Sequence, residues 1–136
     1  MNAKVVAEEE VRQLEGWLFA EGEKLADVYA VGFQEIVDLN AVNVAMDGQS
    51  AKRAQAWQDR LTAALNGNQQ RERYVLVGEK HLVGILLLVF VKEMHLRSVR
   101  EVAGATVGVG FGGLAGNKGG AALRFKFYDS YFCFGQ

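Results

Sequence analysis

Residue types that build many functional sites are scarce in this 136-residue chain. A single cysteine, Cys133, allows neither a disulfide framework nor a Cys/His metal cluster, and such scarcity fits a reducing compartment. Because it lies in the apolar run Tyr131–Phe134, we expect Cys133 to be buried as a small hydrophobe. The two histidines, His81 and His95, are not at ligand spacing, so neither a metal centre nor a catalytic triad can be argued from them. Proline is absent, and nothing in the pattern explains this.

An excess of one charge and a long apolar run are also missing. The formal net charge is −1 and the pI about 6.1, so bulk charge does not indicate nucleic-acid binding, and any anion site must be local. The apolar run Leu82–Val91 is about half as long as the roughly 20 residues of a transmembrane helix. We expect a strand buried on both faces there. Met1–Glu15 is charged throughout and does not resemble a signal peptide.

Hydrophobic spacing predicts one mixed α/β (α+β) domain in which strands outnumber helices. Helices are expected over Val5–Phe19 and Ser50–Leu65, the second closed by Asn66-Gly67, with a short helix over Leu96–Val102. The expected strands are Asp27–Phe33, Tyr74–Gly78, Leu82–Lys92, Ala121–Phe127 and Tyr131–Phe134, with Glu79–His81 connecting the second and third. The chain stops just after the last of these strands, so we expect it to be a fragment of a longer domain.

The most unusual stretch is the glycine-rich segment Thr106–Phe127, which holds seven of the sixteen glycines. Glycine inside a regular element costs about 0.5–1 kcal/mol against alanine, so this density favours backbone that turns sharply or approaches a ligand closely. Apolar residues alternate over Ala121–Phe127, which predicts that the glycines lead into a half-buried strand.

Two nucleotide-binding motifs resemble parts of this segment, and neither fits. Gly108, Gly110 and Gly113 match G-x-G-x-x-G, but that fingerprint must open a helix, whereas this one precedes a strand. A Walker A loop needs glycine before its lysine and Ser/Thr after it, where this chain has Asn117 and Gly119.

Three residues are candidates for phosphate and metal chemistry. Glu35 follows a predicted strand, where its carboxylate can hold a hard cation such as Mg²⁺. Asn117 and Lys118 lie among glycines whose backbone N–H groups can form an anion-binding concavity, to which lysine adds a point charge. The alternatives are a solvent-facing or salt-bridged glutamate and a flexible hairpin with an exposed lysine.

Three segments resemble the inositol polyphosphate 5-phosphatases, the synaptojanin-like phosphatases of the exonuclease–endonuclease–phosphatase superfamily. They are AVGFQEIVDLNAVNV (Ala30–Val44), YVLVGEKHLVGILLLVFVK (Tyr74–Lys92) and VGVGFGGLAGNKGGAALRF (Val107–Phe125). The resemblance implies part of a four-layer α/β/β/α sandwich with mostly antiparallel and mixed sheets, truncated at both ends. Residues 1–136 would be the N-terminal half of the catalytic domain, with residues 1–13 poorly matched.

The resemblance also implies roles for individual residues. Glu35 corresponds to the magnesium-binding glutamate of the catalytic site, while Asn117 and Lys118 match the Gly-Asn-Lys-Gly element that meets the inositol phosphate. Phe111 and Leu114 would face the bilayer, unless they fold back into the core.

The implied activity is magnesium-dependent removal of the 5-phosphate from phosphoinositides such as phosphatidylinositol 4,5-bisphosphate. The implied location is cytoplasmic and peripheral at membranes, without nucleic acid as a partner. The family's Trp-Asn-Val-Asn, Ser-His-Leu, Gly-Asp-Leu-Asn and Ser-Asp-His motifs have no match here, so we expect the fragment to be inactive alone. The alternatives are a truncated form that binds phosphoinositide membranes without hydrolysis and a nuclease of the same superfamily.

Overall fold

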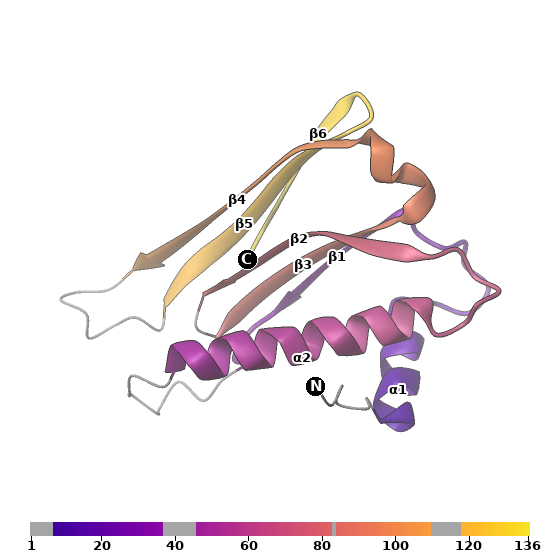
Figure 1. The fold of residues 1–136 in the computed structure, drawn as a ribbon, viewed down its shortest axis with the longest axis horizontal. Coiled ribbons are helices and arrows are strands. Elements are labelled where there is room, and N and C mark those ends of the chain that lie inside the picture. The colour runs from indigo at the N-terminus through magenta and orange to yellow at the C-terminus, as the bar shows by residue number, and fades with distance from the viewer. Residues whose placement is uncertain (1–6, 37–45, 83, 110–117) are drawn as a thin grey trace.

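The computed structural model describes residues 7–36, 46–82, 84–109 and 118–136 (Figure 1). Its elements are α1 (Glu8–Leu18), β1 (Val28–Phe33), α2 (Met46–Asn66), β2 (Tyr74–Leu82), β3 (Ile85–Lys92), the 3₁₀ helix η1 (Glu93–Ser98), β4 (Val99–Val109), β5 (Lys118–Phe127) and β6 (Ser130–Gly135). The mixed α/β class expected from the sequence is therefore confirmed.

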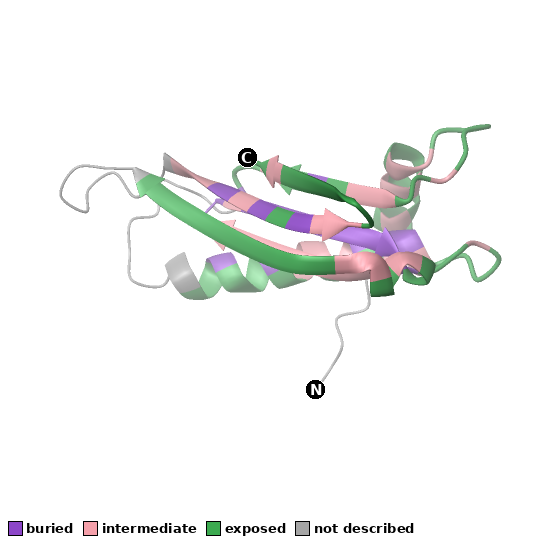
Figure 2. Ribbon diagram, turned by 90° about the horizontal axis from the view of Figure 1, so that it is seen from above, coloured by how far each residue is buried: buried purple, intermediate pink, exposed green. Residues whose placement is uncertain are grey.

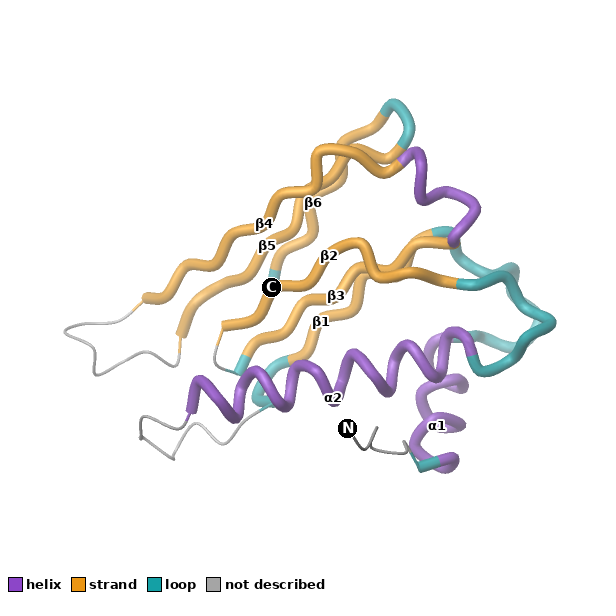
Figure 3. Tube along the Cα trace, viewed as in Figure 1, coloured by secondary structure: helices purple, strands orange, loops and turns teal. Residues whose placement is uncertain are grey.

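The strands form two antiparallel sheets that pack face to face (Figures 1 and 3). Sheet A has the order β1-β3-β2, and sheet B has the order β4-β5-β6. The helices cover the face of sheet A that is turned away from sheet B. The described residues thus form three layers of the expected sandwich: helices, sheet A and sheet B.

The central strand β3 separates two hydrophobic cores. Its residues Leu86, Leu88 and Phe90 face the helices, and Leu87 and Val89 face sheet B. Since consecutive side chains of a strand point to opposite faces, a strand between two apolar layers must be apolar throughout. The strand expected from the run Leu82–Val91 is confirmed, although β3 itself begins at Ile85.

The long helix α2 lies along the outer face of sheet A. Leu61 and Leu65, four residues apart on one face of the helix, are fully buried against the sheet. The helix ends at Asn66, where the sequence predicts its end. The Asn66 side chain accepts a hydrogen bond from the backbone N–H of Tyr74 (2.8 Å) and donates one to the carbonyl of Tyr74 (2.9 Å). This pairing fixes the end of α2 to the start of β2.

Two expectations about the strands are wrong. Glu79–His81 continue β2 to Leu82 because each pairs with a residue of β3, and Gly84 lies in a turn before β3. The helix expected over Leu96–Val102 is instead the 3₁₀ helix η1, which ends at Ser98 and is followed by β4. The β-branched residues Val99 and Val102 fit a pleated strand better than a helix.

The expected burial of Cys133 is also wrong, because the thiol is exposed. β6 is the outer strand of sheet B, so it has a neighbour on one side only. Phe132 and Phe134 pair with Phe125 and Leu123 and turn toward sheet A, and the alternation of the strand turns Cys133 away from it. In Figure 2 most of β4 and β6, the two outer strands of sheet B, is coloured as exposed.

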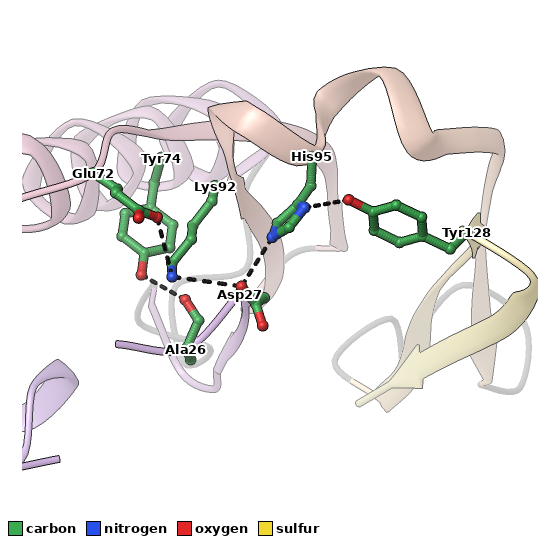
Figure 4. A network of polar contacts seen from close by, with 7 residues as sticks. All are labelled: Ala26, Asp27, Glu72, Tyr74, Lys92, His95 and Tyr128. Atoms are coloured by element: carbon green, nitrogen blue, oxygen red, sulfur yellow. Dashed lines mark hydrogen bonds and ion pairs between the residues drawn. The ribbon is translucent and has the colours of Figure 1, made fainter. Parts of the chain in front are cut away.

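A polar network joins the two sheets at the end of the sandwich where β1 starts and β5 turns into β6 (Figure 4). We call it the Asp27 cluster; its members are Asp27, Glu72, Lys92, His95 and Tyr128. The Lys92 ammonium lies 3.1 Å from Glu72 and 3.5 Å from Asp27. The His95 ring contacts the Asp27 carboxylate through Nε2 (2.9 Å) and the Tyr128 hydroxyl through Nδ1 (2.5 Å). It therefore connects the start of β1 to the β5–β6 turn.

Candidate functional site

Glu35 lies just beyond the end of β1, at one edge of sheet A. The backbone N–H of Ile36 donates a hydrogen bond to the carbonyl of Gly84, 3.1 Å away, in the β2–β3 turn. Glu35 has a φ of 54°, a left-handed conformation that costs a residue with a Cβ roughly 1–2 kcal/mol. Its side chain is exposed. The chain thus turns sharply after β1 and leaves an accessible carboxylate beside the β2–β3 turn.

The glycine-rich segment contributes the neighbouring edge of sheet B. β4 ends and β5 begins opposite each other, with Gly108 paired to Gly119 and Val109 paired to Lys118. A Cβ on Gly119 would lie 2.5 Å from Cδ2 of Leu82 and would overlap the carbonyl oxygen of Val107. Glycine is therefore required at position 119, chiefly by the backbone carbonyl of Val107 in the neighbouring strand β4 and also by the Leu82 side chain of sheet A.

Together these contacts place both strand ends at the same end of the two-sheet sandwich. Leu82, which touches Gly119, comes two residues before Gly84, and Gly84 binds the residue that follows Glu35. Lys118 directly precedes Gly119. The end of β1 and the start of β5 are thus linked by a continuous chain of contacts, and Figure 1 shows both on the same side of the molecule.

The other predicted site residues are not placed. Phe111, Leu114 and Asn117 lie outside the described residues, and for Lys118 only the backbone is described. The part that is described confirms that the glycines lead into a strand, because β5 begins at Lys118. A dinucleotide-binding fingerprint opens a helix, so the strand that follows these glycines distinguishes the segment from such a fingerprint.

Gln136 is a polar residue near this edge that sequence patterns do not single out. Its side chain crosses from the end of β6 to Gly32 of β1, three residues before Glu35. Among the described residues its carboxamide makes no hydrogen bond. A glutamine at the end of an apolar strand carries no signal in the sequence, because the contact depends on the packing of one sheet over the other.

A metal ion at this edge would have few protein ligands in the described parts of the chain. No group of three or more His, Cys, Asp or Glu side chains gathers there in metal-binding geometry. Mg²⁺ keeps several waters and is often held by one or two carboxylates together with substrate phosphates. The exposed Glu35 carboxylate fits such a site as a single ligand.

A separate hollow in the described residues lies away from this edge. It has a volume of about 680 Å³ and is lined by Glu101, Val102, Ala103, Arg124 and Tyr131. Ala103 and Arg124 are paired across β4 and β5 and alternate with the residues that face sheet A, so the hollow is on the outer face of sheet B. The Tyr131 hydroxyl donates a hydrogen bond to Glu101 there (2.7 Å).

Comparison with known proteins relates the whole chain to one family. Residues 1–136 match the family described as Endonuclease/Exonuclease/phosphatase family 2. Inositol-1,4,5-trisphosphate 5-phosphatase 1 of Schizosaccharomyces pombe is 42% identical over 123 residues, which are 90% of this chain and 11% of that protein. Human synaptojanin-2 is 40% identical over 109 residues, 80% of this chain and 7% of that protein. The chain thus spans roughly a tenth of the length of these relatives.

Solved structures agree with this relationship. The inositol polyphosphate 5-phosphatase domain of SPsynaptojanin, solved with inositol (1,4)-bisphosphate and a calcium ion, is 38% identical with a TM-score of 0.73. The match covers 90% of this chain and 34% of that one. A Cimex nitrophorin, with 20% identity and a TM-score of 0.57 over 84% of this chain and 35% of that one, shares the fold alone. The resemblance predicted from the sequence is confirmed, and the chain belongs to endonuclease/exonuclease/phosphatase family 2.

Proposed function

We propose that this chain is part of a phosphatase that removes the 5-phosphate from phosphoinositides such as phosphatidylinositol 4,5-bisphosphate. The observation that carries the proposal is the shared edge at which β1 ends near Glu35 and β5 begins at Lys118. The similarity to named inositol phosphate 5-phosphatases supports the same substrate class.

In this proposal the two strand ends hold opposite sides of one phosphorylated head group. Glu35 is an accessible carboxylate that binds Mg²⁺, and Lys118 supplies a positive charge to the phosphate oxygens. Asn117 and the backbone N–H groups of the neighbouring glycines add neutral donors. A magnesium ion, when bound, neutralises part of the negative charge that develops on the phosphate during hydrolysis.

Binding and turnover need different groups. Glu35 is present, whereas the family motif with the asparagine and aspartate that position the attacking water is absent from the 136 residues. Phosphate-monoester hydrolysis is among the slowest uncatalysed reactions, so the loss of these groups lowers the rate by many orders of magnitude. We therefore propose that the chain by itself binds the head group and does not turn it over.

The proposed place of action is the cytoplasmic surface of a membrane. Phe111 and Leu114 are apolar residues beside Asn117 and Lys118, and their insertion between lipid head groups would bring this edge to its substrate. In the described parts of the chain, no helix combines the length and the apolar character needed to cross a bilayer.

A chimera tests the catalytic part of this proposal. The matching segment of the S. pombe relative is replaced by this chain, and phosphate release from phosphatidylinositol 4,5-bisphosphate is measured with Mg²⁺ present. We expect turnover within about tenfold of the parent, and a loss of at least roughly 100-fold on Glu35→Gln. The matched control is Glu21→Gln, which changes an exposed glutamate in the loop after α1. Full turnover by the Glu35→Gln chimera would refute the role of Glu35.

A further inference from the structure

The last residue of the chain, Gln136, has a fixed backbone at the site edge of sheet B. Its N–H donates a hydrogen bond to the carbonyl of Ala121, and its own carbonyl accepts one from the N–H of Ala121, both at 2.9 Å. Ala121 is the third residue after Lys118 in β5. The Gln136 side chain therefore starts from a defined point close to the beginning of that strand.

From this point the side chain crosses to sheet A. A Cβ on Gly32 would lie 2.6 Å from Cδ and 3.3 Å from Nε2 of Gln136, and it would overlap Oε1. The carboxamide thus occupies the space that a side chain at position 32 would fill. Gly32 is in β1, three residues before Glu35, so Gln136 stands between the strand that leads to Glu35 and the strand that begins at Lys118.

The carboxamide of Gln136 has no hydrogen-bond partner within the part of the chain that the structure describes, and the residue is partly exposed. A glutamine side chain offers two N–H donors and a carbonyl acceptor, and it stays neutral at every physiological pH. Leaving such a group partly buried without a partner costs free energy, so a site that retains it gains when a ligand completes its hydrogen bonds.

We propose that Gln136 is a further substrate-binding residue of this edge, whose carboxamide N–H donates to phosphate oxygens of the bound inositol phosphate. The inference rests on the proposed function. It also gives Gly32 a role, since only glycine at that position lets the carboxamide lie between the two sheets.

The test measures binding of inositol 1,4-bisphosphate to the 136-residue chain by calorimetry, with Mg²⁺ present. We expect Gln136→Ala to weaken binding about tenfold, a loss typical of one hydrogen bond to a charged group. Gly32→Ala should cause the same loss, because its methyl group displaces only the flexible end of the Gln136 side chain. The double variant should bind no more weakly than Gln136→Ala alone, since both changes remove one contact.

Two control variants separate this effect from a general loss of structure. Gln13→Ala removes an exposed glutamine of α1, and Gly16→Ala adds a methyl group where nothing lies within 4 Å. Both should bind like the unchanged chain. In the unchanged chain, the side-chain NH₂ resonance of Gln136 should also shift on addition of the probe, a readout that needs no variant to fold.

The outcomes distinguish the inference from the proposed function. If the unchanged chain binds the probe and neither Gln136→Ala nor the NH₂ resonance responds, the inference is wrong and the proposed function stands. Additive losses in the double variant would also overturn it, because Gly32 would then act independently of Gln136. If the unchanged chain does not bind the probe at all, both proposals fail together.

Discussion

Leu82 of β2 and Gly119 of β5 lie so close together that a Cβ at position 119 would be 2.5 Å from the Leu82 side chain. This contact sets sheet B against the β2–β3 turn of sheet A. Through the hydrogen bond from Ile36 to Gly84, the same turn holds the end of β1. One packing contact thus relates the position of Glu35 to the start of β5.

Gly119→Ala should destabilise the fold. The added methyl group would overlap the carbonyl oxygen of Val107 as well as Leu82, so backbone must move, and overpacking of this kind costs about 1–3 kcal/mol. Gly108→Ala is the matched control, because Gly108 is paired with Gly119 but has open space around its Cβ position. Urea unfolding of both variants measures the difference. Equal stability of the two variants would show that Val107 and Leu82 crowd position 119 less than the structure describes.

Asp27→Asn should make the fold less sensitive to acid. The hydrogen bond from His95, aided by the charge of Lys92, holds the pKa of the Asp27 carboxyl below its ordinary value of 3.8. A lowered pKa means that the carboxylate stabilises the folded state above the unfolded-state pKa, and that this contribution is lost as the pH falls through the folded-state pKa. Unfolding free energies between pH 5 and about pH 2 should therefore fall less steeply in the variant, whereas Glu9→Gln, an exposed change in α1, should leave the slope unchanged.

Lys92→Met should flatten the alkaline limb of the stability profile. Hydrogen bonding to Glu72, together with the charges of Glu72 and Asp27, raises the pKa of the Lys92 ammonium above its ordinary value of 10.5. A raised pKa means that the stabilisation is complete below the unfolded-state pKa and is lost as the pH rises through the folded-state pKa. Thermal melts from pH 9 to about pH 11.5 should show a smaller decline for the variant. An unchanged decline would mean that Lys92 does not pair as Figure 4 shows.

Tyr74→Phe should cost about 0.5–1.5 kcal/mol of unfolding free energy. The Tyr74 hydroxyl donates a hydrogen bond to the carbonyl of Ala26 (2.5 Å), and the residue as a whole is 1% exposed. The variant keeps the ring packing and leaves the Ala26 carbonyl without this donor. Tyr131→Phe is the comparison at an exposed position, where water replaces the lost bond to Glu101 and the expected change is within about 0.5 kcal/mol. Chemical denaturation of the two variants would contradict the account if Tyr131→Phe were the more damaging change.

Cys133 should react readily with a thiol reagent in the folded protein. The thiol lies exposed on the outer strand of sheet B. We expect the native chain to react within about tenfold of the rate in denaturant, since access and the thiolate fraction govern the rate. Protection by several orders of magnitude would instead support the burial expected from the sequence.

The local sequence pattern was sufficient to predict those helices and strands whose buried residues follow a regular spacing along the chain. The unbroken apolar run before Lys92 predicts a strand between two layers, and β3 separates the two cores in that way. The spacing in α2 and its end at Asn66 were likewise predictable, because each depends on neighbours in sequence. The pairing of strands into two sheets came from family resemblance rather than from the pattern itself.

The errors arose where distant partners decide the structure. Val99–Val102 fit a short helix by spacing, but Val99 and Arg100 pair with Phe127 and Lys126 of β5, and those partners favour a strand. Cys133 is apolar in type, yet its place on an edge strand exposes it. The contact of Gln136 with Gly32 could not be predicted, since it joins residues 104 positions apart across two sheets.

The most direct test of the account is whether one inositol phosphate meets both strand ends. Backbone amide spectra of the chain are recorded as inositol 1,4-bisphosphate is added with Mg²⁺ present. The account predicts shifts at Glu35 and Ile36 after β1 and at Lys118 and Gly119 in β5, with the same binding constant at all four. Shifts confined to one strand end, or centred on the Asp27 cluster at the far end of the sheets, would contradict it.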